Sequence, residues 1–154
     1  MLKGIDPLLN ADLLYVLAAM GHGDELALVD RNFPATSNAQ RLVRLDGVDM
    51  ATAAHAIFSI LPLDSFVDEP VVRMEVVGAP DDVTELQSEL LELAESAEER
   101  SLVMGALPRH AFYARAQSAF AVVATSEARP YSCFLLVKGV IGAVAPVPRR
   151  SEVG

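Results

Sequence analysis

The sequence predicts a single α/β domain in which helices alternate with the strands of a mixed sheet. Short apolar segments with strand-like patterns alternate along the chain with segments whose apolar residues recur at helical spacing. The last two strand-like segments, 119–125 and 131–138, are joined by too few residues to hold a crossover helix. We therefore expect them to form an antiparallel hairpin within an otherwise mainly parallel sheet.

Four segments have helical patterns. They cover residues 11–20, 50–61, 81–100 and 109–118, of which the third is long and acidic. Asn10 is a plausible N-cap for the first, and Gly21 suits the left-handed residue that ends a helix. Asp49 lies near the start of the second, and Pro62 closes it.

Three further segments, 25–29, 41–45 and 70–78, have the patterns of strands. Residues 34–38 are expected to form a loop, and Asp46-Gly47 a turn. Residues 143–154 have no apolar period and are expected to form a flexible tail. The predicted organisation is therefore one domain over residues 1–142 followed by this tail.

Composition excludes several classes of function. The chain has 154 residues, 52% of them hydrophobic, which is enough for one buried core and leaves apolar surface for subunit contacts. A net charge of −9 argues against a nucleic-acid partner, because such binding depends on Lys and Arg patches. Without a membrane-length apolar stretch or a secretory signal, and with Cys133 as the single cysteine, we expect a soluble cytoplasmic protein with no membrane partner.

No motif for a cofactor or a metal is present in the sequence. There is no glycine-rich phosphate loop, no dinucleotide fingerprint, no cysteine pair and no His-Glu-x-x-His. We therefore expect neither a cofactor nor a metal.

Two residues around the first predicted strand are suited to acid/base chemistry. His22 stands between Gly21 and Gly23 in a loop, where a proton-transfer group is often found. A loop histidine bonded to a backbone carbonyl is the alternative. Asp30 follows the strand, where side chains of α/β proteins often face a ligand crevice. It could equally be a turn-forming residue that accepts backbone N–H bonds before Pro34.

Arg109 and Tyr131 are candidates for binding a ligand. A cation at a helix start opposes the helix dipole, so Arg109 indicates a ligand oxygen or a neighbouring acid. The alternative is a solvent-facing residue of the first turn. Tyr131 offers a ring face and a hydroxyl, as sugar sites use, although packing at a strand edge would also explain it.

Several separate motifs occur in order along the chain. They are Met1-Leu2-Lys3-Gly4-Ile5, Met20-Gly21-His22-Gly23-Asp24-Glu25, the 30–34 block, the segment 112–122, Tyr131 and Lys138-Gly139-Val140. Together they resemble the family that contains the L-fucose mutarotases and the D-ribose pyranases. The resemblance runs from Met1 to about Gly142, and the Gly-His-Gly-Asp motif at residues 21–24 is closer to the fucose branch.

The resemblance implies a ribose pyranase-like fold, a single-domain three-layer α/β/α sandwich with a mixed, mainly parallel sheet. It implies a mutarotase that interconverts the α and β anomers of a free aldose by acid/base-assisted ring opening. L-fucose is the first candidate for this sugar. His22 takes the role of proton-transfer group. The substrate-binding roles fall on Asp30, Arg109 and the run Tyr131-Ser132-Cys133.

The family's fucose enzymes typically have Asn where this chain has Cys133, so the resemblance leaves the sugar open. A non-catalytic sugar-binding or regulatory module of the same fold is the alternative, and an acidic interaction protein without a ligand is a third.

Geometry sets a further condition on the site. A continuous strand at about 3.3 Å per residue would separate His22 from Asp30 by roughly 20 Å or more, too far for one monosaccharide. Either the chain folds back near Gly23, or two subunits build the site. The resemblance favours the second choice, because members of that family form homo-oligomeric rings, often decamers, with sites near subunit contacts.

Overall fold

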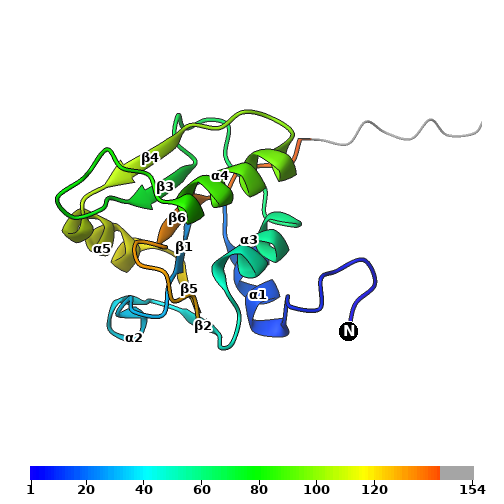
Figure 1. Ribbon diagram of the computed structural model, residues 1–154. Coiled ribbons are helices and arrows are strands. Elements are labelled where there is room, and N and C mark those ends of the chain that lie inside the picture. Colours follow the sequence, from blue (N-terminus) through cyan, green and yellow to red (C-terminus); the bar gives the residue numbers. More distant parts are fainter. Residues whose placement is uncertain (143–154) are drawn as a thin grey trace, which may run out of the picture.

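The computed structural model describes residues 1–142, so the predicted tail at 143–154 lies outside the described residues. Six strands form one sheet in the order β2-β5-β1-β6-β3-β4 (Figure 1). The strands are β1 (Glu25–Val29), β2 (Leu42–Leu45), β3 (Val71–Met74), β4 (Met104–Leu107), β5 (Ala121–Thr125) and β6 (Phe134–Val137). β6 runs antiparallel to both neighbours, and the other pairings are parallel, which confirms the mixed, mainly parallel sheet.

Helices cover both faces of this sheet. They are α1 (Ala11–Ala19), α2 (Ala35–Asn38), α3 (Met50–Phe58), α4 (Glu85–Glu98) and α5 (Arg109–Ser118). Alternate side chains of a strand point to opposite faces. In β1, Leu26 and Leu28 pack with α1, α3 and α4, whereas Ala27 and Val29 pack with α2 and α5. These two groups of helices lie on opposite sides of the sheet (Figure 1). The predicted three-layer α/β/α sandwich is confirmed.

Two helix starts follow from local sequence. The Asn10 side chain accepts a hydrogen bond from the Leu13 N–H at 2.9 Å, and the Asp49 side chain accepts one from the Thr52 N–H at 2.8 Å. Both are the bonds of an N-cap residue, so both predicted helix starts are confirmed.

Several other predicted boundaries were wrong. The segment 34–38, expected as a loop, contains α2, and β4 was not predicted at all. α3 ends at Phe58 instead of residue 61, β3 ends at Met74 instead of residue 78, and α4 begins at Glu85 instead of residue 81. β4 is a four-residue edge strand, Met-Gly-Ala-Leu, without a clear alternation, so tertiary pairing with β3 decides its conformation.

The expected hairpin between the last two strands was also wrong. β1 lies between them, parallel to β5 on one side and antiparallel to β6 on the other. The connection at 126–133, which we call the arch, therefore crosses the carboxyl end of β1 instead of turning back beside β5. The short length of the arch excludes a crossover helix, but it does not determine which strand β6 pairs with.

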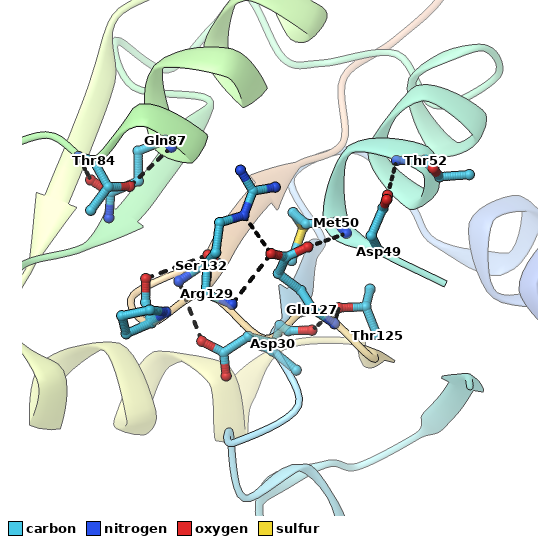
Figure 2. Close-up of polar contacts among 12 residues, drawn as sticks. Asp30, Asp49, Met50, Thr52, Thr84, Gln87, Thr125, Glu127, Arg129 and Ser132 are labelled. Atoms are coloured by element: carbon cyan, nitrogen blue, oxygen red, sulfur yellow. Dashed lines mark hydrogen bonds and ion pairs between the residues drawn. The ribbon is translucent and has the colours of Figure 1, made fainter. Parts of the chain in front are cut away.

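Buried Glu127 anchors the arch. One of its carboxylate oxygens accepts a hydrogen bond from the Met50 N–H at 3.1 Å, and the other accepts one from Arg129 Nε at 2.6 Å (Figure 2). Its carbonyl accepts a bond from the Arg31 N–H at 3.0 Å. Burial by itself raises the pKa of Glu127, but the bonds from Arg129 and Met50 together outweigh burial and lower that pKa. The arch is thus tied to the start of α3 and to the end of β1.

We expect Glu127→Ala to lower the free energy of unfolding by about 2 to 3 kcal/mol, because it leaves a buried N–H and a guanidinium without their acceptor. Urea unfolding at neutral pH measures this change. The control is Asp46→Ala, which breaks an ion pair whose Arg44 and Asp46 side chains are 57% and 71% exposed, at an expected cost below about 1 kcal/mol. Equal losses in the two variants would contradict the anchoring role.

Candidate functional site

A cavity of about 220 Å³ lies at the edge of the sheet where β1 and β3 end and β6 begins. Four predicted site residues line it, namely Asp30, Arg109, Tyr131 and Cys133. The remaining lining residues are Asn32, Phe33, Met74, Val77, Tyr113 and Pro130. Ser132, the other predicted binding residue, is fully buried in the arch and does not line the cavity.

The carboxylate of Asp30 lies at the floor of the arch and is 6% exposed. One oxygen accepts hydrogen bonds from the N–H groups of Asn32 at 3.0 Å and Phe33 at 3.1 Å. The other accepts one from the Ser132 N–H at 3.3 Å (Figure 2). The turn-forming interpretation of Asp30 therefore describes these bonds. The oxygen that faces Ser132 keeps a second lone pair, so the carboxylate can still accept a hydroxyl from the cavity.

Arg109, at the start of α5, lies across the ring of Tyr113. Its Nε donates to the Tyr113 hydroxyl at 3.1 Å, and its guanidinium carbon lies 5.3 Å from the ring centroid. Within residues 1–142 no carboxylate forms an ion pair with Arg109. Within the described residues, no ion pair therefore offsets the charge at this helix start. Arg109 is exposed, which fits the solvent-facing interpretation as well as a ligand oxygen.

Cys133 forms a wall of the cavity with a chemistry different from that of an amide. The side chain is almost fully buried. Burial, followed by the negative charge of the nearby Asp30, raises the pKa of the Cys133 thiol well above its ordinary value. The group is therefore a neutral thiol at physiological pH, with one weak donor and a weak acceptor.

His22 lies at the opposite edge of the sheet, before β1 begins. The Gly23 N–H donates to the carbonyl of Lys138, just beyond the end of β6, and β1 then runs without interruption along both neighbours. The chain therefore does not fold back at Gly23, and His22 does not line the cavity. The prediction for Gly21 was wrong: Gly23, with φ 85°, takes the left-handed conformation, and Gly21 does not.

His22 forms a pair with a buried carboxylate that the sequence analysis missed. Its Nε2 lies 2.8 Å from an Asp64 oxygen, and Asp64 is 2% exposed while the imidazole is 44% exposed. The bond to a carboxylate replaces the bond to a backbone carbonyl considered above. In the neutral tautomer whose Nε2–H donates a hydrogen bond to Asp64, Nδ1 has a free lone pair and can act as a base.

Asp64 is held in place by its own loop. Its second oxygen accepts a bond from the Val67 N–H at 3.1 Å, and its carbonyl accepts one from an Arg100 nitrogen at 3.0 Å. Burial, the largest influence, raises the pKa of Asp64, yet the bonds from His22 and from the Phe66 and Val67 amides together lower it. No sequence signal identifies this residue, because 42 positions separate it from His22.

Exposed apolar side chains lie on the segments next to the His22–Asp64 pair. The ring of Phe66 lies 5.1 Å from the imidazole. Phe66, Val67, Val140 and Ile141, on the two segments that meet at this edge, are each at least 43% exposed. An exposed acid/base group thus lies beside an apolar rim, which is typical of a surface that another protein covers.

In the part of the chain that the structure describes, no group of three or more His, Cys, Asp or Glu side chains is arranged to hold a metal ion. No described helix combines the length and the hydropathy needed to cross a membrane.

A family model described as the RbsD / FucU transport protein family matches residues 3–141. The chain belongs to this family. The resemblance inferred from the sequence motifs is thereby confirmed. The matched residues include every strand and helix described above.

Relatives and a solved structure agree with this membership. The fucose mutarotase of Homo sapiens is 43% identical over 146 residues, covering 91% of this chain and 94% of its own. The L-fucose mutarotase of Actinobacillus pleuropneumoniae is 41% identical over 151 residues, covering 91% and 97%. The crystal structure of the fucose mutarotase of Streptococcus pneumoniae in complex with L-fucose has a TM-score of 0.85 and 38% identity, covering 92% and 100%.

The lowered pKa of Asp64 predicts how its contribution to stability depends on pH. A carboxyl whose pKa is lower in the folded than in the unfolded protein stabilises the fold above its unfolded pKa of about 4, and this contribution is lost as pH falls through the folded value. We therefore expect the stability difference between wild type and Asp64→Asn to be full at pH 6 and to shrink below about pH 4. Urea unfolding at several pH values measures it, and a difference that is constant with pH would contradict the assignment.

Proposed function

We propose that this protein is a monosaccharide mutarotase that interconverts the α and β anomers of a free aldose, with L-fucose as the first candidate. The observation that carries the proposal is the cavity in which a carboxylate, a guanidinium and a tyrosine meet. The named activity of the relatives and the L-fucose in the Streptococcus pneumoniae structure support it. We assign this function to a mutarotase domain at residues 1–142.

Anomer exchange requires two proton transfers. The anomeric hydroxyl loses its proton while the ring oxygen gains one, the ring opens to the aldehyde, and rotation about the C1–C2 bond precedes closure on the other face. A positioned acid or base typically accelerates each proton transfer by about 10² to 10⁴, so a histidine at near-neutral pH can catalyse this reaction. We assign proton transfer to His22 through Nδ1, with Asp64 orienting its ring.

The cavity residues hold the sugar in this proposal. Asp30 accepts a sugar hydroxyl, and Arg109 donates to a hydroxyl or to the oxyanion that develops as the ring opens. Tyr131 binds the sugar or relays a proton, whereas Ser132 contributes through its backbone N–H to Asp30. Cys133 contacts the sugar without amide hydrogen bonds, so this wall of the cavity decides among sugars that differ at one hydroxyl.

We further propose that two subunits of a homo-oligomeric ring, with a decamer as the first candidate, complete each site. The uninterrupted β1 and the apolar rim beside His22 support this, because the His22 edge of one subunit can cover the cavity edge of the next. A contact between two different surfaces, repeated around an axis, closes a ring. A cytoplasmic location is part of the same proposal, supported by the single, buried and unpaired Cys133.

Saturation-transfer proton NMR on the anomeric signals of L-fucose, D-ribose, D-galactose and L-rhamnose tests the activity. We expect the wild-type protein to accelerate anomer exchange of one of these sugars, with L-fucose as the first candidate. The rate of exchange should be at least about 10²-fold lower in His22→Ala. His55→Ala, which truncates an exposed histidine on α3, is the matched control and should retain full activity.

The non-catalytic alternative, for which Cys133 in place of the family's Asn is the supporting observation, makes a different prediction. A binding module would bind a sugar without accelerating exchange and would tolerate His22→Gln with little loss of affinity. Such a result with a folded oligomer would contradict the catalytic proposal.

Mixing two inactive variants tests the shared site. His22→Ala and Arg109→Ala should each be inactive alone, whereas oligomers refolded from an equal mixture should regain about a quarter of the sites, in which an intact His22 faces an intact Arg109. Anomer exchange by the mixture is the measurement. A mixture that forms mixed oligomers, as mass spectrometry can establish, and yet stays inactive would show that each site needs both residues from one chain.

A further inference from the structure

Two buried side chains hold the peptide group between Tyr131 and Ser132. Its carbonyl accepts a hydrogen bond from Gln87 Nε2 at 2.9 Å, and its N–H donates to the Asp30 carboxylate at 3.3 Å. Gln87 is 0% exposed and Asp30 is 6% exposed. The plane of this peptide, near the end of the arch, is therefore set by one residue of α4 and one residue that follows β1.

Tyr131 itself has an unfavourable backbone conformation. Its φ is 59°, in the left-handed region that residues with a Cβ atom rarely occupy. Such a conformation typically costs about 1 to 3 kcal/mol and persists only where the surroundings determine it. The bonds to the 131–132 peptide are the surroundings that hold it here. The result is that Tyr131, which lines the cavity, depends on contacts outside its own segment.

Gln87 is itself fixed in orientation. Its Oε1 accepts a bond from the Thr84 N–H at 3.1 Å, while the Thr84 hydroxyl accepts one from the Gln87 N–H at 3.1 Å (Figure 2). This capping box leaves Nε2 facing the interior, where it donates to the carbonyls of Met74 and Tyr131, both at 2.9 Å. Met74 and Tyr131 both line the cavity.

We propose that Gln87 is a positioning residue for sugar binding. It holds Tyr131 in its left-handed conformation and ties it to Met74 at the end of β3. The kinetic part of this inference rests on the proposed function, and the conformational part does not. Gln87 touches no substrate, so its removal should act through Tyr131 on the affinity for sugar more than on the proton transfer assigned to His22.

The first variant is Gln87→Glu, which keeps the acceptor for the Thr84 N–H and replaces the two N–H donors to the interior with at most the single O–H of a protonated carboxyl. We expect the Ser132 amide to exchange with solvent about tenfold faster, and KM for the sugar to rise about tenfold with a smaller change in kcat. Thr84→Ala is the matched control, because it removes the hydroxyl of the capping box and leaves the Gln87 amide in place. It should change Ser132 exchange and KM less than about twofold.

Unchanged Ser132 exchange in Gln87→Glu, or equal effects of Gln87→Glu and Thr84→Ala, would overturn the inference. Gln87→Met, which has a similar volume and no charge, replaces Gln87→Glu if a buried carboxylate prevents folding. Hydrogen exchange needs no sugar, so a wild-type protein without any mutarotase activity would contradict the proposed function while the conformational part is still tested.

A second pair of variants tests the strained conformation without touching Gln87. Glycine adopts a positive φ freely and alanine does not, so Tyr131→Gly should have an unfolding equilibrium constant about tenfold smaller than Tyr131→Ala. If Tyr131→Ala is as stable as Tyr131→Gly, residue 131 is not held in the left-handed conformation and the inference is wrong.

Discussion

The position of β1 between β5 and β6 is the constraint on which the site depends. Because β5 and β6 lie on opposite sides of β1, the arch that joins them must cross the carboxyl end of β1. Asp30 follows that end directly, and its carboxylate accepts a hydrogen bond from the Ser132 N–H of the arch. The crossing therefore brings Tyr131 and Cys133 to the edge where Met74 and Arg109 already lie. One choice of strand order thus assembles a cavity from four separate segments.

The same strand order separates the two kinds of chemistry. The polar cavity lies at one edge of the sheet, and the His22–Asp64 pair lies at the other, with the whole length of β1 between them. A strand is extended and paired on both sides, so it cannot shorten to bring its two ends together. In our proposal a second subunit therefore brings the His22–Asp64 pair to the cavity, because one chain of this fold keeps them apart. The exposed apolar side chains around His22 are consistent with that arrangement.

Buried carboxylates at both edges share one physical feature. Asp30, Asp64 and Glu127 are each at most 6% exposed, and each accepts at least two hydrogen bonds from backbone or side-chain donors. Burial without partners would cost several kcal/mol per charge, so these bonds decide whether the loops that carry them are ordered. At Glu127 and Asp64, the hydrogen bonds lower the pKa of the carboxyl in spite of burial. The loops of the site are therefore held by polar contacts, while the apolar layers hold the sheet and the helices.

The sequence by itself determined the features that depend on neighbouring residues. The caps Asn10 and Asp49 bond to amides three positions away, the apolar run of β1 is continuous, and the family motifs mark His22, Asp30, Arg109 and Tyr131 in linear order. Only the tertiary structure decided the strand order, the conformation of β4, the pairing of Asp64 with His22 and the contact of Gln87 with Tyr131. These last two contacts join residues 42 and 44 positions apart, and no local pattern encodes which distant partner a buried polar group will find. The physical reason is that hydrogen-bond satisfaction in a core is a property of the packed whole, whereas caps and periodicity are properties of a few consecutive residues.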